Sequence, residues 1–260
     1  MTPAKTDLPL GKGITAFSTL RDTDSPDQPY SGFNACHYTG DTPSHVDQCR
    51  SALCHTLSIN PERLIIPTQT HSDNVTVIDS IPVAPETIDN TDALVTGIPG
   101  VALCINTADC APILMADPEA GVIAAVHSGW RGTVQKITGK TVRKMIELGA
   151  DANRIKVAAG PMICNDCFEV GPEVAEEFER IFPQGGTVDY SRIKPHIDLF
   201  KAITITLTDS GIKKCNISPP VACSRCSYRN YFSARRMGTL SGRTLSAIIC
   251  RGADGGQKRR

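Results

Sequence analysis

The stretch from Cys104 to Gly132 constrains the fold more than any other part of the sequence. Two short apolar runs, 111–116 and 121–126, flank a connection that contains Asp117 and Pro118. This pattern predicts two buried strands joined by a tight turn. If the strands pair as an antiparallel hairpin, Cys110 before the first run and His127 after the second meet at one sheet edge. A thiol and an imidazole placed in this way are either a nucleophile with its base or two ligands of one metal.

The length and the charge balance limit the possible functions. A chain of 260 residues with 40% hydrophobic residues can bury a large core, and we favour one large domain over two ordinary ones. Lysine plus arginine equals aspartate plus glutamate at 27 each. No net charge therefore draws the protein to nucleic acid or to an anionic membrane, and no partner of either kind is expected.

The N-terminal sequence and the cysteine content indicate the compartment. Residues 1–12 contain no apolar signal-peptide core, and no apolar run approaches the length of a membrane helix. We therefore expect a cytoplasmic protein. The chain has eleven cysteines, and in a reducing compartment these favour free thiols or metal ligands over disulfides.

Hydrophobic periodicity and turn residues predict a chain of mixed strands and helices. We expect a lead-in over 1–12, one domain over 13–250 and a disordered basic tail over 251–260. Helices are expected at 45–58, with a capping box at Ser44 and Asp47, and at 133–148, 173–181 and 196–210. Further strands are expected at 13–19, 63–67, 76–78, 92–96, 155–159, 231–233 and 244–250. The irregular order of these elements favours an α+β fold with mixed sheets and the helices outside.

Three residues form the strongest candidate chemical set. Cys110, His127 and a third residue, His71, together supply one thiolate and two imidazoles, a plausible set for an open zinc site with water in the fourth position. The alternative is that Cys110 is a buried small residue and that the two histidines only satisfy local hydrogen bonds. A metal-free hydrolase that uses Cys110 and His127 as nucleophile and base is also possible, as is a binding module in which zinc is structural.

Two Cys-x-x-Cys pairs, Cys164 with Cys167 and Cys223 with Cys226, suggest a four-cysteine zinc site. The 55 residues between the pairs exceed the roughly 15–20 of a compact zinc knuckle. On spacing we therefore prefer unligated thiols. A redox role is possible, although neither pair clearly opens a helix after a strand.

Arginines in Gly- and Ser-rich turns could bind phosphate or carboxylate. They are Arg131, Arg235, Arg236 and Arg243. For each of them a solvated surface role is the simpler interpretation.

Taken together, several segments resemble the YfiH or laccase-domain family of multifunctional purine nucleoside enzymes. The resemblance covers about Asn34 to Ile249. Its most specific parts are Gln69-Thr70-His71, Ala108-Asp109-Cys110, Val126-His127-Ser128-Gly129-Trp130-Arg131-Gly132, and Phe232-Ser233 with Arg235-Arg236.

The resemblance implies a layered α/β/β/α fold in which His71, Cys110 and His127 bind one zinc, or sometimes copper. It implies phosphorolysis of adenosine, inosine and methylthioadenosine, and deamination of adenosine. Asn34, Arg50, Arg131 and Arg235 are the candidate substrate-binding residues.

The resemblance also implies two other activities, oxidation of phenols by copper-loaded protein and editing of peptidoglycan precursors. A multicopper oxidase needs many histidines, whereas this chain has six. We therefore predict a zinc enzyme that acts on nucleosides and phosphate, as a monomer or a weak homo-oligomer. The family pattern is broken at Asp73-Asn74 and at Met237-Gly238-Thr239, which weakens the transfer of substrate contacts but not of metal ligands.

Overall fold

The predicted hairpin forms at the centre of the molecule. Its strands are β7 (Ala111–Asp117) and β8 (Val122–Ser128), which pair antiparallel with Pro112 opposite His127. Gly121 closes the turn at a φ of +69°, a backbone conformation that favours glycine. The prediction that the residues around Cys110 and His127 meet at one end of this hairpin is confirmed.

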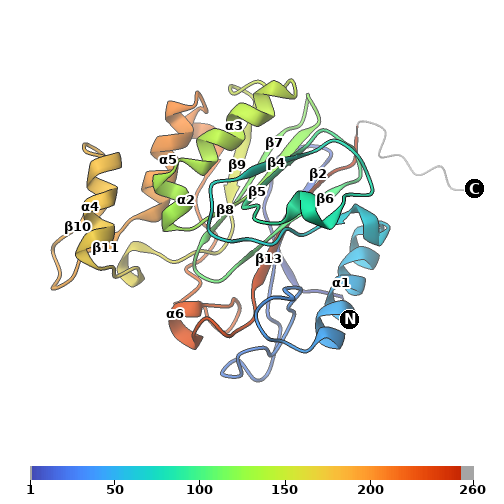
Figure 1. Ribbon diagram of the computed structural model, residues 1–260, viewed down its shortest axis with the longest axis horizontal. Helices are drawn as coiled ribbons and strands as arrows, with labels where there is room; N and C mark the ends of the chain where they lie inside the picture. The colour runs from blue at the N-terminus through green and yellow to red at the C-terminus, as the bar shows by residue number, and fades with distance from the viewer. Residues whose placement is uncertain (1, 253–260) are drawn as a thin grey trace, which may run out of the picture.

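Two large sheets lie face to face in the computed structural model, which describes residues 2–252 (Figure 1). Among these residues, one sheet has the strand order β12-β9-β7-β8-β5-β4 and the other β1-β2-β13-β6-β3, while β10 and β11 form a separate pair. The remaining strands are β1 (Lys5–Asp7), β2 (Ile14–Thr19), β3 (Leu64–Ile65), β4 (Val75–Ile78), β5 (Ala93–Thr96), β6 (Ala102–Thr107), β9 (Lys156–Ala159), β10 (Val188–Asp189), β11 (His196–Ile197), β12 (Ile217–Ser218) and β13 (Thr244–Cys250).

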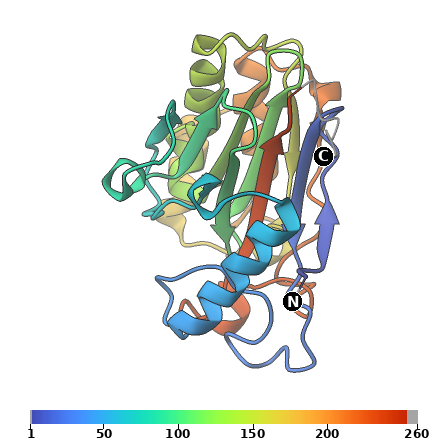
Figure 2. The same ribbon diagram turned by 90° about the vertical axis from the view of Figure 1, so that its right-hand side faces the viewer.

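Helices cover the outer faces of both sheets. The helices are α1 (Pro43–Leu57), α2 (Trp130–Val134), α3 (Ile137–Glu147), α4 (Pro172–Ile181), α5 (Leu199–Asp209) and α6 (Ala234–Met237). Helix α1 packs on the sheet that contains β13, and α3 and α5 pack on the sheet that contains β8 (Figures 1 and 2). The order of layers is therefore helix, sheet, sheet, helix, which confirms the expected α+β fold with its mixed sheets.

Apolar side chains fill the space between the two sheets. Leu103, Leu114 and Ile248 are completely buried there. Because β7 and β8 bury their other faces under α3, both strands read as nearly continuous apolar runs. This explains why the hairpin is the clearest signal in the sequence.

Helix boundaries differ from the prediction in three places. The capping box at Ser44 is wrong, because α1 begins after Thr42 with Pro43 in its first turn. The helix expected over 133–148 is two helices, since Lys136 adopts a left-handed backbone (φ +58°) between α2 and α3. The helix expected over 196–210 begins only at Leu199, because Asp198 caps it by accepting from the backbone N–H of Lys201.

Two further expectations also change. Residues 231–233 are not a strand; Ser233 instead caps α6. The lead-in over 1–12 contains β1, which pairs with β2. Most of the predicted disordered tail, 253–260, lies outside the described residues.

Within residues 2–252, none of the helices combines the length and the apolar character that crossing a bilayer requires.

Candidate metal centre

Three predicted ligands meet at the end of the hairpin. Cys110 lies in the bend before β7, His127 near the end of β8, and His71 in the loop between β3 and β4. Their donor atoms lie within 4.8 Å of one another, and Cys110 Sγ is 3.9 Å from His71 Nε2. His127 is buried, Cys110 half-buried and His71 exposed, so the group has one open side, next to His71.

Asp92 fixes the orientation of His127. The two residues lie side by side where β5 pairs with β8, and the backbone N–H of His127 donates to the Asp92 carbonyl at 2.7 Å. The His127 ring also donates from Nδ1 to Asp92 Oδ1 at 2.7 Å. Nε2 of His127 is thereby left for a ligand, an arrangement that carboxylates commonly impose on metal-binding histidines.

The same carboxylate shapes the loop that carries His71. Asp92 accepts backbone N–H groups from Thr70 (3.2 Å), His71 (3.1 Å) and Ser72 (2.7 Å), and the Ser72 hydroxyl at 2.6 Å. These bonds hold His71 at a φ of +62°, which non-glycine residues rarely adopt. A backbone conformation that costs about 1–3 kcal/mol is typical of functional sites, where surrounding contacts enforce it.

Gln69 attaches this loop to the second sheet. Its side-chain amide donates to the Asn106 carbonyl and accepts the Asn106 N–H, both at 2.8 Å. Gln69 and His71 of the Gln-x-His motif thus have separate tasks, since the glutamine anchors the loop to β6 and the histidine faces Cys110.

Gly129 leaves space beside the three donors. A Cβ atom at this position would lie 3.0 Å from Cys110 Sγ and 3.3 Å from His71 Cδ2. Either distance is closer than ordinary van der Waals contact between such atoms. The backbone of Gly129 (φ −73°) would accept any residue, so it is the packing beside the three donors that requires glycine here.

Charged neighbours change the pKa values of these groups. Burial alone would raise the pKa of the Cys110 thiol, but the adjacent His127 and His71 lower it to about 6. Burial would lower the pKa of His127, whereas Cys110 and Asp92 raise it to about 9. Burial would raise the pKa of Asp92, but its hydrogen bonds with His127 and Ser72 lower it to about 2.

The donor set fits a transition-metal ion. The low pKa of Cys110 makes it a thiolate at neutral pH, which is the form that binds metals. One thiolate and two imidazoles suit zinc or copper, and three protein ligands with an open side are typical of catalytic zinc.

A family model described as "Multi-copper polyphenol oxidoreductase laccase" matches residues 15–251, nearly the whole chain. The chain belongs to this family. Two curated relatives extend the match. The protein named "Adenosine deaminase RL5", from an unknown prokaryotic organism, is 42% identical over 91% of this chain and 94% of its own length. A "Purine nucleoside phosphorylase" from Bacteroides thetaiotaomicron is 36% identical over 91% of each chain.

Two solved structures have a similar fold. YlmD from Geobacillus stearothermophilus has a TM-score of 0.82 at 26% identity, over 92% of this chain and 93% of its own. The Bacillus licheniformis hypothetical protein YfiH has a TM-score of 0.84 at 24% identity, over 94% and 96% of the two chains. The four-layer arrangement is thus the fold of experimentally determined relatives.

Of the four predicted substrate-binding residues of this laccase-family chain, Asn34 and Arg50 are occupied by protein partners. Asn34 is completely buried; its amide donates to Asp41 (2.8 Å) and accepts from the backbone of Cys36 (3.2 Å) and Arg243 (3.0 Å). Arg50 donates to the Ala35 carbonyl (3.0 Å) and to His37 (2.7 Å). Both residues therefore shape the segment 34–41.

Arg131 and Arg235 are exposed, and each lies near a residue that adjoins a ligand. Arg131 follows Gly129 by two residues, and its guanidinium lies 4.3 Å from the centre of the Trp130 ring. The backbone N–H of Arg235 donates to Asp109, the neighbour of Cys110, at 2.6 Å. Asp109 also accepts from the Ser224 hydroxyl at 2.6 Å, so both of its carboxylate oxygens are engaged.

The sequence did not identify Asp92 as part of the site. It also favoured unligated thiols for the two Cys-x-x-Cys pairs. The only signal for Asp92 was its place as the polar first residue of the strand expected over 92–96. The four cysteines were set aside because of their spacing, yet their sulfur atoms lie within 4.8 Å of one another. All eleven cysteines lie within the described residues, and none of them forms a disulfide there.

Proposed function

We propose that this chain is a zinc-dependent enzyme that acts on purine nucleosides. Its reactions are phosphorolysis of adenosine, inosine and methylthioadenosine to the base and the (methylthio)ribose 1-phosphate, and deamination of adenosine. The observation that carries the proposal is the convergence of His71, Cys110 and His127 around one open side. The relatives named as an adenosine deaminase and a purine nucleoside phosphorylase support the substrate class.

The metal would be held by His71 Nε2, Cys110 Sγ and His127 Nε2. Zinc at this centre would lower the pKa of a coordinated water toward neutrality, which is the property that attack on C6 of adenosine requires. Asp92 keeps the His127 ring in the tautomer that presents Nε2. Because Gly129 has no side chain, it leaves the space beside Cys110 open to a substrate.

Asp109 acts through position and not as a proton donor in this proposal. Its two oxygens accept from Ser224 and Arg235, and its φ of +85° turns the chain just before Cys110. The carboxylate thereby sets where the Cys110 sulfur lies at the start of β7.

Phosphorolysis needs an anion held close to the sugar, where positive charge grows in the transition state. Arg131 and Arg235 are exposed and lie at the open end of the ligand hairpin, Arg131 just after β8 and Arg235 hydrogen-bonded to Asp109 just before β7, and we assign the phosphate to them. Asn34 and Arg50 hold the segment 34–41, which we expect to border the nucleoside.

Product analysis on adenosine, with and without phosphate, tests the proposal. Phosphorolysis gives adenine and ribose 1-phosphate only when phosphate is present, whereas deamination gives inosine without it. His71→Ala should abolish both products, while His55→Ala, which changes an exposed histidine on α1, should leave them unchanged.

Chelation separates the metal enzyme from a cysteine hydrolase. Removing zinc should abolish turnover, and adding zinc back should restore it. Full activity in the presence of a chelator, together with loss of activity on thiol alkylation, would instead assign the reaction to Cys110 as a nucleophile.

Copper-dependent phenol oxidation is the second candidate, favoured by the thiolate and imidazole donors that copper also binds. Copper-loaded and zinc-loaded protein should be compared on a phenol in air. Oxidation by the copper form at a rate above nucleoside turnover by the zinc form would make oxidation the principal activity.

A further inference from the structure

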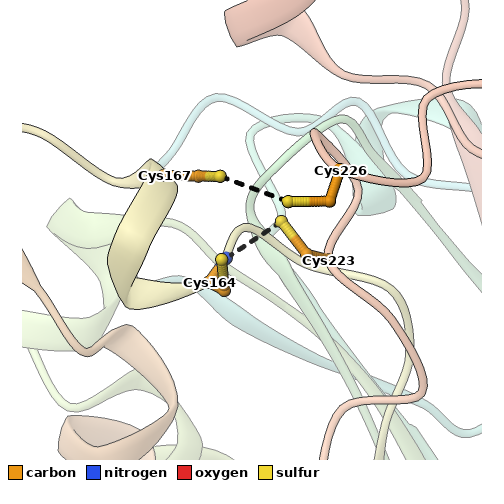
Figure 3. A group of neighbouring side chains, drawn as sticks. All are labelled: Cys164, Cys167, Cys223 and Cys226. Carbon is orange, nitrogen blue, oxygen red and sulfur yellow. Dashed lines mark hydrogen bonds between the residues drawn. The ribbon is translucent and has the colours of Figure 1, made fainter.

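A second cluster of metal-binding side chains lies apart from the proposed catalytic residues. It consists of Cys164, Cys167, Cys223 and Cys226, whose four sulfur atoms lie within 4.8 Å of one another (Figure 3). Two segments supply them, one after β9 and one after β12. None of the four is a ligand of the first centre.

The spacing of the sulfur atoms suits one tetrahedral ion. Four bonds of about 2.3 Å to zinc place the sulfurs about 3.8 Å apart. Cys167 Sγ and Cys226 Sγ are 3.5 Å apart, and the whole set lies within 4.8 Å. A disulfide would need about 2.05 Å, so the group is organised as four separate thiols.

Backbone hydrogen bonds hold both Cys-x-x-Cys segments in place. Met162 pairs with Cys223 in an isolated parallel bridge, which aligns the two segments. The Cys167 N–H donates to the Cys164 carbonyl at 3.0 Å and the Ser227 N–H to the Cys223 carbonyl at 2.9 Å, so each pair is wound into a turn. The Cys164 N–H donates to Cys223 Sγ at 3.4 Å, a contact that would stabilise a metal-bound thiolate at this position.

We propose that these four cysteines bind a structural zinc ion, separate from the catalytic one. Four thiolates without an open position are the usual ligands of structural zinc. The long spacing that argued against this site is bridged by the fold, because residues 168–222 form α4, β10, β11, α5 and β12 and return to Cys164. Zinc here closes that excursion, and its binding free energy stabilises the folded chain because the unfolded chain has no preformed site.

The site also connects to the first centre. Ser224, between the two cysteines of the second pair, is buried and donates to the Asp109 carboxylate at 2.6 Å. The N–H of Ile163, just before the first pair, donates to the Asp109 carbonyl at 2.9 Å. Residues in or next to both Cys-x-x-Cys segments therefore donate hydrogen bonds to Asp109, the residue before Cys110. A zinc ion bound to the four cysteines would thus help to fix the position of Asp109.

Zinc content per chain, measured by mass spectrometry of the full-length protein, tests the assignment. We expect two zinc ions in the wild type, one in Cys110→Ala and one in Cys167→Ser/Cys226→Ser. Cys215→Ser changes an exposed cysteine outside both clusters and should keep two.

X-ray absorption of Cys110→Ala identifies the remaining ligands without relying on a variant of the cluster. We expect four sulfur neighbours at about 2.3 Å from zinc. No zinc in Cys110→Ala, a zinc with nitrogen or oxygen neighbours, or iron in its place would overturn the proposal. Both measurements are made without turnover, so their failure would leave the proposed nucleoside activity standing.

Discussion

Replacing Asp92 with asparagine keeps the size of the side chain but removes the carboxylate that holds His71 and His127 in place. The carboxylate receives five hydrogen bonds, from Thr70, His71, Ser72 (two) and His127. Oδ1 serves the His71 N–H and the His127 ring, and Oδ2 serves the others. An asparagine that keeps its oxygen toward His127 turns an NH₂ group toward the N–H groups of Thr70 and Ser72.

The size of the effect follows from those contacts. Two part-buried N–H groups, those of Thr70 and Ser72, lose their acceptor at about 1–2 kcal/mol each, so the metal-free chain should lose about 2–4 kcal/mol of unfolding free energy. For a chain of this length, about 2 °C per kcal/mol, that is a fall in Tm of about 4–8 °C. Loss of the partner that orients a metal-binding histidine should weaken zinc binding about 10- to 100-fold.

Competition with a chromogenic zinc chelator measures the affinity, and calorimetry measures the Tm. Asp89→Asn, which changes an exposed carboxylate three residues away, is the matched control and should alter neither. Wild-type zinc affinity and Tm in Asp92→Asn would refute the role assigned to this carboxylate.

Three further perturbations test other parts of the structure. Gly129→Ala places a methyl group 3.0 Å from Cys110 Sγ, so it should weaken zinc binding by roughly tenfold or more in a chelator titration, with unchanged circular dichroism; unaltered affinity would show that the space is not needed. The Asp117 carboxylate is fully buried; burial would raise its pKa, but hydrogen bonds from Arg154 and from backbone N–H groups lower it. The ionised Asp117 carboxylate therefore stabilises the fold above its unfolded pKa of about 3.9, and this stabilisation is lost as the pH falls through the lower folded pKa. Asp117→Asn should be less stable than wild type at pH 7, and the difference in urea midpoints between the two proteins should shrink below about pH 4. A difference that does not change with pH would contradict this. Phe178→Ala removes a fully buried ring from α4 and should cost about 3–5 kcal/mol in urea unfolding, while a loss below about 1 kcal/mol would mean that α4 does not pack as described.

Local patterns predicted the hairpin and the order of its polar residues. Both strands are buried on two faces, so their apolar runs are continuous and the turn between them is short. Cys110 and His127 then follow from antiparallel pairing alone. His71 could not be placed by such reasoning, because it comes from a separate loop, and the family resemblance supplied it.

Contacts between segments that are far apart in the sequence could not be predicted from local patterns. Asp92 meets His127 only because β5 lies beside β8, a pairing that no turn or spacing announces. The four cysteines come together only because residues 168–222 return to the same edge of the sheet. A spacing rule derived from compact zinc knuckles does not apply to a loop that contains its own helices.

Hydrophobic periodicity also did not predict where the backbone interrupts a helix. Apolar spacing runs through residues 133–148 and suggested one helix, but the left-handed Lys136 divides it. The apolar face is preserved across the break, since Val134 and Ile137 join the same core. A hydrophobic pattern thus records which face is buried without recording where a helix is interrupted.

Anomalous X-ray diffraction at the zinc absorption edge, on crystals of protein purified without added metal, shows whether His71, Cys110 and His127 bind one ion. We predict an anomalous peak at about 2.0–2.4 Å from His71 Nε2, Cys110 Sγ and His127 Nε2. No peak at that position, with the three side chains turned away from one another, would contradict it.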